Sequence, residues 1–221
     1  MGGYVLWWGR KDAFPGADGS TITQATGTNQ NAETIILYGT DGTTELIEDK
    51  NGYCKVSITT EGILSENTSQ TYSVKHPLTV IYNSFSVWDW YTNTENHNDD
   101  LWGDGEHKSD YDPCPLGWRV SQDGIWNDFE ENTKYYSQGT PTSAGNSTIS
   151  NGVLYNDFVW FPAGGRIFTT GTRSNVGNNV FLWSSTVSGT SAKNIYCSMG
   201  GVLHISTYGR TNALSIRCVQ E

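Results

Sequence analysis

The sequence predicts an α+β domain that is mostly antiparallel β-sheet, with one or two helices and long loop insertions. Only 16% of its 221 residues are charged whereas 13% are aromatic, and this composition suits strands and turns better than helices. The last third of the chain carries the strongest pattern, because short apolar segments alternate there with glycine-bearing turns. The four segments are 158–162, 181–184, 194–198 and 214–219.

Shorter aromatic or β-branched runs predict further strands in the first half of the chain. These runs lie at 4–8, 34–38 and 53–58, with 71–74 and 78–82 as short edge strands. Two stretches rich in small polar residues, 21–31 and 135–151, show no apolar period and are predicted to be surface loops.

Residues 111–120, Tyr-Asp-Pro-Cys-Pro-Leu-Gly-Trp-Arg-Val, form the most constrained stretch of the chain. Pro113 and Pro115 restrict the backbone on both sides of Cys114, so this stretch cannot be helical. Gly117 permits a tight turn directly after it. The sequence therefore predicts a rigid corner with a structural role.

An amphipathic helix is predicted directly after this corner, over 121–132. Ser121 can serve as its N-cap, and no proline interrupts the segment. Gly124 weakens the helix by up to about 1 kcal/mol relative to alanine. The predicted apolar face consists of Ile125, Trp126 and Phe129.

Residues 88–112 mix large aromatic side chains with many carboxylates and amides. This composition predicts an irregular loop whose aromatic residues anchor it to the core. Oxygen-rich loops suit calcium, so a calcium ion is the possible cofactor here. The pattern of an EF-hand fails because Trp102 stands where an Asp or Asn is required when Asn98 is position one. A solvated polar loop is the favoured interpretation.

The net charge of −10 disfavours nucleic acid and anionic membrane surfaces as partners. No run approaches the roughly 18 apolar residues that a membrane span requires, so membrane insertion is not expected. Residues 1–8 show neither a basic segment nor a cleavage site, and we expect an exported form of this chain to be a processed fragment.

The four cysteines lie at positions 54, 114, 197 and 218 without any Cys-x-x-Cys spacing, which disfavours a zinc site. Their even number allows no, one or two disulfides. The sequence also lacks the nucleophile-elbow, zinc-protease and phosphate-loop motifs, and its four histidines lie far apart at 76, 97, 107 and 204. We therefore expect a protein that is not an enzyme.

The segment at 111–120 resembles the opening motif of the FISUMP (major paralogue) domain, which is common in surface proteins of gut Bacteroidetes. Further similar motifs follow in the family order, and upstream segments resemble versions of the domain in fimbrillin-like proteins. The matching segments are 6–16, 76–79, 111–120, 125–129, 161–166, 182–186 and 214–219.

This resemblance implies a single C-type-lectin-like domain over 1–221, with a long irregular insertion at about 17–110. It further implies that the two ends of the chain pair as adjacent strands and that a disulfide joins Cys114 to Cys218. The bond would close a loop between positions 104 residues apart and would imply an oxidising compartment. The expected location is extracellular or at the cell surface. The resemblance gives no role to Cys54 or Cys197.

Residues 164–221 are also similar to the variable segments of diversity-generating-retroelement proteins, which place variable ligand-binding residues on a lectin-like scaffold. Cys218 departs from that pattern, because many such segments carry proline there. By this resemblance, the candidate ligand-binding residues are Tyr196, Ser198, Leu203, Ser206, Thr207 and Tyr208, with His204 as their neighbour. The alternative is that Tyr196 and Leu203 pack beneath the sheet while the hydroxyl residues form ordinary turns.

The resemblances together imply an extracellular, non-enzymatic ligand-binding domain, such as an adhesin or a fimbrial-tip protein. Its partner would be a carbohydrate or protein ligand bound through 164–221. One alternative is a retroelement-diversified receptor-binding protein of a phage or bacterium. The other is a structural fimbrial subunit without a ligand.

Overall fold

The computed structural model of the chain describes residues 4–15, 54–64, 69–77, 79–85, 87–129, 131–137, 140–142, 152–171, 173–175, 179–197 and 203–221. Within these ranges, the only α-helix is the short α1 (Ser69–Lys75), and every ladder between named strands is antiparallel except the pair β3–β4. The prediction of a mostly antiparallel β protein with little helix is therefore confirmed.

A five-stranded sheet joins the two ends of the chain. Its order is β11 (Arg173–Ser174), β10 (Arg166–Ile167), β15 (Ala213–Leu214), β1 (Tyr4–Trp7) and β2 (Phe14–Pro15). Leu6 pairs with Leu214 and Trp7 pairs with Ala213. The structure thus contains the pairing of chain ends that the resemblance implied.

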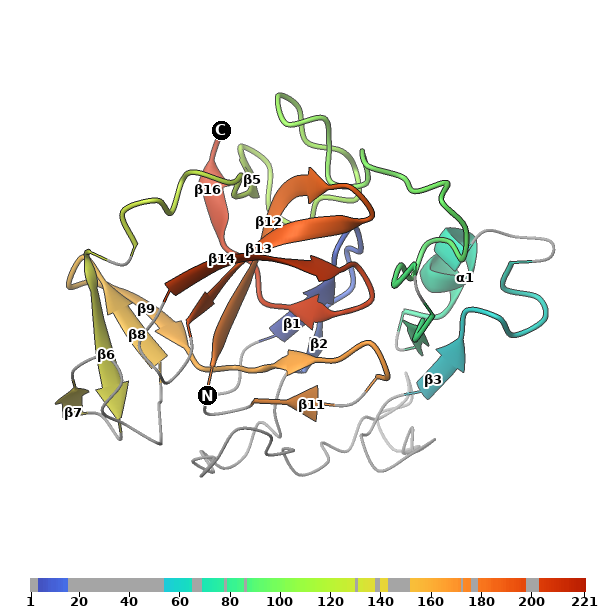
Figure 1. Cartoon of the computed structure of the whole chain (residues 1–221). Helices are drawn as coiled ribbons and strands as arrows, with labels where there is room; N and C mark the ends of the chain where they lie inside the picture. The colour runs from blue at the N-terminus through green and yellow to red at the C-terminus, as the bar shows by residue number, and fades with distance from the viewer. Residues whose placement is uncertain are drawn as a thin grey trace, which may run out of the picture.

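A three-stranded sheet at the middle of the molecule carries most of the candidate binding residues (Figure 1). It consists of β12 (Val180–Ser188), β13 (Ser191–Cys197) and β14 (Leu203–Gly209) in that order. The turn between β12 and β13 has only two residues, and Gly189 there has the positive φ (57°) that such tight hairpins need.

Three further sheets surround this centre. A four-stranded sheet has the order β7 (Thr140–Thr142), β6 (Thr133–Ser137), β8 (Gly152–Tyr155) and β9 (Val159–Pro162). β16 (Cys218–Gln220) pairs with β5 (Trp118–Val120), and β3 (Cys54–Ser57) pairs in parallel with β4 (Thr79–Tyr82). The four-stranded sheet and α1 lie on opposite sides of the central sheet (Figure 1).

The central sheet is covered on both faces, because alternate residues of its strands enter two separate hydrophobic clusters. Phe181, Trp183 and Ala192 belong to the larger cluster, which also contains Trp7 and Trp8. Val180, Leu182 and Ile195 belong to the smaller cluster, together with Trp126 and Phe129.

Buried indole N–H groups tie the central sheet to β1. Trp8 Nε1 donates to the Ser184 carbonyl at 3.0 Å, and Trp183 Nε1 donates to the Leu6 carbonyl at 3.0 Å. Each of these tryptophan rings therefore packs in the core, while its indole N–H group donates a hydrogen bond to a strand that is distant in sequence.

The predicted helix over 121–132 is wrong, because residues 123–129 form a succession of turns. Gly124 has φ of 92°, which is incompatible with a right-handed helix. The Ser121 hydroxyl does not act as an N-cap but accepts a hydrogen bond from Trp126 Nε1 at 2.9 Å. Trp126 and Phe129 are buried as predicted, whereas Ile125 is 41% exposed.

The predicted edge strand at 71–74 is also wrong, because this segment lies within α1. Helical spacing places Ser69 and Ser73 on the buried side and stacks Tyr72 on His76 with ring centroids 4.2 Å apart. The predicted loop at 135–151 is partly wrong, because strands β6 and β7 extend into it. The predicted strand at 34–38 and loop at 21–31 lie outside the described residues.

Residues 88–112 contain no named helix or strand, as predicted. Buried Trp90 and Trp102 attach this segment to the core by donating to the carbonyls of Trp8 at 2.6 Å and Arg10 at 3.1 Å. In the described part of the chain, no helix is long and apolar enough to cross a membrane.

Candidate functional site

The candidate ligand-binding residues lie on β13 and β14, except Ser198, which falls outside the described residues. The register pairs Tyr196 with His204 and Ala192 with Tyr208. The other candidate pairs are Asn194–Ser206, Lys193–Thr207 and Cys197–Leu203. The antiparallel pairing of the two strands therefore brings together positions that are up to 16 residues apart.

Strand alternation divides these positions between the two faces of the central sheet. Tyr196, Ser206 and Tyr208 occupy one face, whereas Thr207 occupies the other. The candidate residues thus do not form one continuous surface, and each face requires its own description.

Tyr196 and Tyr208 meet three further residues in a group that we call the aromatic–arginine cluster: Arg166, Phe168, Phe181, Tyr196 and Tyr208. The rings of Phe181 and Tyr196 stack with centroids 5.0 Å apart and an interplanar angle of 14°. The centroids of Phe181 and Tyr208 are 6.1 Å apart. The Arg166 guanidinium carbon lies 4.8 Å, 5.0 Å and 4.8 Å from the centroids of Phe168, Phe181 and Tyr208.

In this cluster, the half-buried Arg166 cation lies among aromatic rings. Burial lowers the pKa of Arg166, while the nearby hydroxyls of Tyr208 and Tyr196 favour its charged form. The guanidinium carbon lies over the Tyr208 ring, beside the hydroxyl that favours the charge. Burial raises the pKa of Tyr208, and the Arg166 charge opposes that shift. Both groups therefore keep their ordinary ionisation at neutral pH, and Arg166 stays cationic.

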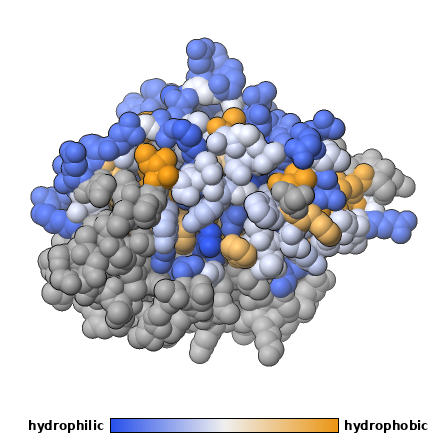
Figure 2. All heavy atoms as spheres, in the orientation of Figure 1, coloured by the Kyte–Doolittle hydropathy of each residue, from blue (hydrophilic) through white to orange (hydrophobic). Residues whose placement is uncertain are grey.

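The cluster is open to solvent on one side, because Phe168 is 39% exposed and the two tyrosines are only partly buried. Figure 2 shows that near-neutral side chains predominate over the middle of this view, while strongly hydrophilic ones dominate its upper rim. Partly exposed tyrosine rings offer a flat apolar surface together with a hydroxyl. The cluster can therefore stack on a ligand and hydrogen-bond to it.

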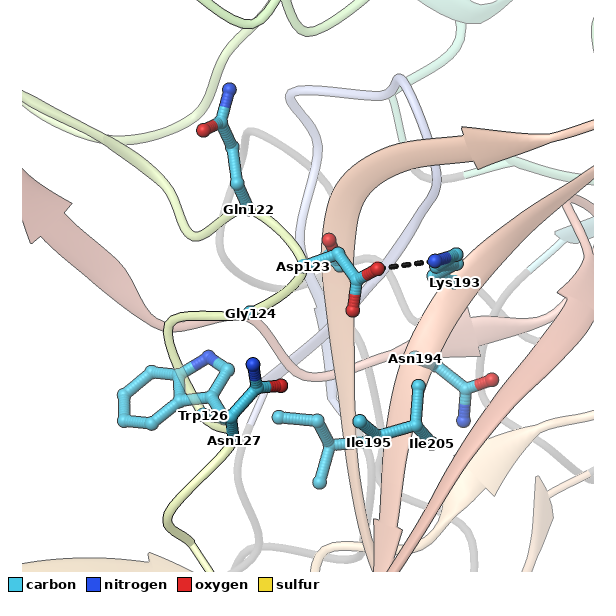
Figure 3. A pocket seen from close by; sticks show the side chains of 10 residues that line it. Gln122, Asp123, Gly124, Trp126, Asn127, Lys193, Asn194, Ile195 and Ile205 are labelled. Carbon is cyan, nitrogen blue, oxygen red and sulfur yellow. Dashed lines mark hydrogen bonds and ion pairs between the residues drawn. The ribbon is translucent and has the colours of Figure 1, made fainter.

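The opposite face of the sheet carries a shallow depression of about 230 Å³, which includes open solvent. Ile195 and the half-exposed Ile205 contribute apolar surface to it, beside the turns that hold Trp126. Lys193 and Asp123 point toward each other and form an ion pair across it (Figure 3). The other lining residues are Gln122, Gly124, Asn127, Ser184 and Asn194.

The side chain of Asn194 points away from Trp126 and Asn127 (Figure 3). Its amide nitrogen and oxygen are buried without a hydrogen-bond partner, but they lie on the other face of the sheet. They are therefore not available to a molecule in the depression. The charged groups of the depression, Lys193 and Asp123, already pair with each other.

Three members of the aromatic–arginine cluster were absent from the sequence-based candidates: Arg166, Phe168 and Phe181. Arg166 and Phe181 lie within segments predicted for other reasons, and no local pattern distinguishes them as site residues. They meet Tyr208 because β10 belongs to the five-stranded sheet that packs against the central one. That arrangement depends on tertiary structure and has no signal in the sequence.

The disulfide that the resemblance implied is present between Cys114 and Cys218, with their Cα atoms 5.7 Å apart. It joins the rigid corner at 111–120 to β16 beside the β5–β16 pairing. Cys197 is buried in the smaller hydrophobic cluster. The side chain of Cys54 lies outside the described part of the structure.

Several of the acidic side chains at 88–112 interact with other groups of the protein. Asp89 lies 2.7 Å from His97 Nδ1, and Asp99 lies 2.5 Å from an Arg210 nitrogen. Backbone hydrogen bonds from His107 and Glu106 lower the pKa of Asp104. Among the described residues, no group of three or more His, Cys, Asp or Glu side chains is arranged to hold a metal ion.

Comparisons of this chain with protein-family models, curated proteins and solved structures found no match.

Proposed function

We propose that this protein is a non-enzymatic, extracellular ligand-binding domain with a C-type-lectin-like fold, of the kind found in adhesins and fimbrial-tip proteins. Its ligand is a carbohydrate or a protein, and it binds through the segment 164–221. The observation that carries this proposal is the aromatic–arginine cluster, which gathers Tyr196 and Tyr208 beside a partly exposed phenylalanine.

The residue types of this cluster are well suited to binding a ligand. Tyrosine rings supply a large contact area at low conformational cost, and their hydroxyls both donate and accept hydrogen bonds. The disulfide is typical of proteins that fold in an oxidising compartment, which supports an extracellular location. The pairing of β1 with β15 is the feature expected of a lectin-like fold and supports that part of the proposal.

A glycan array and a panel of host surface proteins, both probed with the wild-type chain, test this function. The variant Y196A/Y208A should weaken binding about fivefold or more, because it removes two stacking surfaces that contribute roughly 0.5–1.5 kcal/mol each. The matched control is F158A, which removes a 79% exposed aromatic residue beside β9 and should leave binding unchanged.

Thermal unfolding of each variant separates loss of binding from loss of fold. If wild type and Y196A/Y208A bound the ligand equally well, the binding site would have to lie outside the cluster. A wild-type chain that binds neither glycans nor proteins would favour a structural role in a fimbria instead.

A further inference from the structure

The half-buried Arg166 differs in its partners from the two fully buried arginines of the described chain, Arg10 and Arg210. Arg10 donates to Asp12 at 2.6 Å and 3.1 Å, and Arg210 donates to Asp99 at 2.5 Å. Among the described residues, Arg166 has no carboxylate within ion-pairing distance. Its Nε is buried without a hydrogen-bond partner. Within the described part of the chain, this half-buried arginine charge therefore has no carboxylate partner, in a protein whose net charge is −10.

The rings around Arg166 do not satisfy its hydrogen-bonding groups. A guanidinium has five N–H donors, and all of them lie in its plane. Attraction to the faces of Phe168, Phe181 and Tyr208 lowers the cost of the charge but provides no acceptor in that plane. Nε itself is buried, so an acceptor from outside the protein would bind the terminal N–H groups of this partly exposed side chain.

The chemistry of the cluster identifies that acceptor. A carboxylate matches the fork of a guanidinium with two parallel hydrogen bonds. Because it is planar, it fits between flat aromatic rings better than a tetrahedral sulfate or phosphate. The partly exposed rings of Phe168 and Tyr208 then lie beside the group that carries the carboxylate, where they can stack on a sugar ring.

We infer that Arg166 is the anion-recognition residue of this domain and that its ligand is an acidic saccharide with a carboxylate, such as a hexuronate or a sialic acid. This inference rests on the proposed function and narrows it to one class of ligand. Arg166 binds the carboxylate, and the rings of Tyr196, Tyr208 and Phe168 contact the sugar.

Matched pairs of saccharides test the inference on the unmodified protein. Titration calorimetry would compare trigalacturonate with its methyl ester, and sialyllactose with lactose. At least one acid should bind ten or more times more tightly than its neutral counterpart. The preference should decrease between 50 mM and 500 mM NaCl, because salt screens a partly exposed charge pair.

The variant R166Q should lose the preference for the acid while its weak binding of the neutral saccharide persists. R166K keeps the charge without the fork and should retain only part of the preference. The control K75Q removes an exposed cation on α1, outside the segment 164–221, and should bind like wild type. If R166Q fails to fold, the comparison of acid with methyl ester on the wild-type protein still decides the question.

The outcomes separate this inference from the function on which it rests. Equal binding of acids and neutral counterparts would overturn the inference and leave the ligand-binding function intact. Preference for sulfated sugars or acidic peptides over carboxylate sugars would likewise overturn the assigned class. Binding of no saccharide and no protein would overturn both.

Discussion

Trp88 has a backbone conformation that bulky residues rarely adopt, with φ of 46°. Its carbonyl accepts hydrogen bonds from the Thr211 amide at 2.9 Å and the Thr211 hydroxyl at 3.0 Å. Its Cβ lies against Gly209 at the end of β14. These contacts fix the position of Trp88 and leave its indole about half exposed.

G209A should therefore destabilise the protein by about 1–3 kcal/mol. The added methyl group would lie 2.5 Å from the Trp88 Cβ and 3.0 Å from its carbonyl oxygen, and Thr211 prevents that carbonyl from moving. Urea unfolding measures the change. The control is G189N, because Gly189 has a positive φ with open space around it and asparagine tolerates that conformation. Equal stability of G209A and wild type would show that the Trp88 loop can move.

At the scale of elements, the segment 121–132 shows how far a local pattern can predict structure. The apolar spacing correctly identified Trp126 and Phe129 as buried, because burial follows from residue type. It did not predict the conformation, since Gly124 adopts φ of 92° and Ser121 accepts from an indole. When a polar side chain could hydrogen-bond to either of two groups, the tertiary structure decides which of the two lies within reach.

G124A tests this explanation. An alanine at that φ should cost about 1–2 kcal/mol of stability. The added Cβ would meet only the Asn127 amide nitrogen, at 3.7 Å, so the cost would come from the backbone alone. G124N should lose less, because asparagine adopts the left-handed region more readily. Urea unfolding gives the stabilities, and far-UV circular dichroism reports helix content. An increase in both for G124A would show that the predicted helix is accessible.

The candidate site was predictable from the sequence only in part. Resemblance identified the strand segments and the cysteine pair, and periodicity identified several strands. Tyr208 and Thr207 lie on opposite faces because they are neighbours in β14. The sequence pattern did not predict a strand there. Arg166 reaches Tyr208 through the packing of two sheets, so neither composition nor spacing could reveal the cluster.

At the scale of the whole molecule, contacts distant in sequence determine the architecture. β1 pairs with β15, and β5 pairs with β16, so the beginning and the middle of the chain both depend on its last residues. The indoles of Trp8 and Trp183 add bonds between segments that lie 176 and 177 residues apart. Closing such large loops has a high entropic cost, and a covalent bond between distant segments reduces it.

The Cys114–Cys218 disulfide provides that bond across 104 residues. In the chain-entropy model, a loop of this length stabilises the folded state by about 4–5 kcal/mol, because the link restricts the unfolded chain. C114A, C218A and the double variant should each lose most of this stability. Because all three variants remove the same bond, the loss in the double variant should be close to that in either single variant.

Guanidinium unfolding of the oxidised and reduced wild type, beside the three variants, measures the effect. Reduction should lower the midpoint of the wild type and leave the midpoints of the variants almost unchanged, since any remaining cysteines lack this link. If the stability loss of the double variant equalled the sum of the losses in C114A and C218A, the packing of the two sulfur atoms would be the dominant contribution. In that case, the entropic contribution of the link would be small, and the pairing of β5 with β16 would itself hold the end of the chain in place.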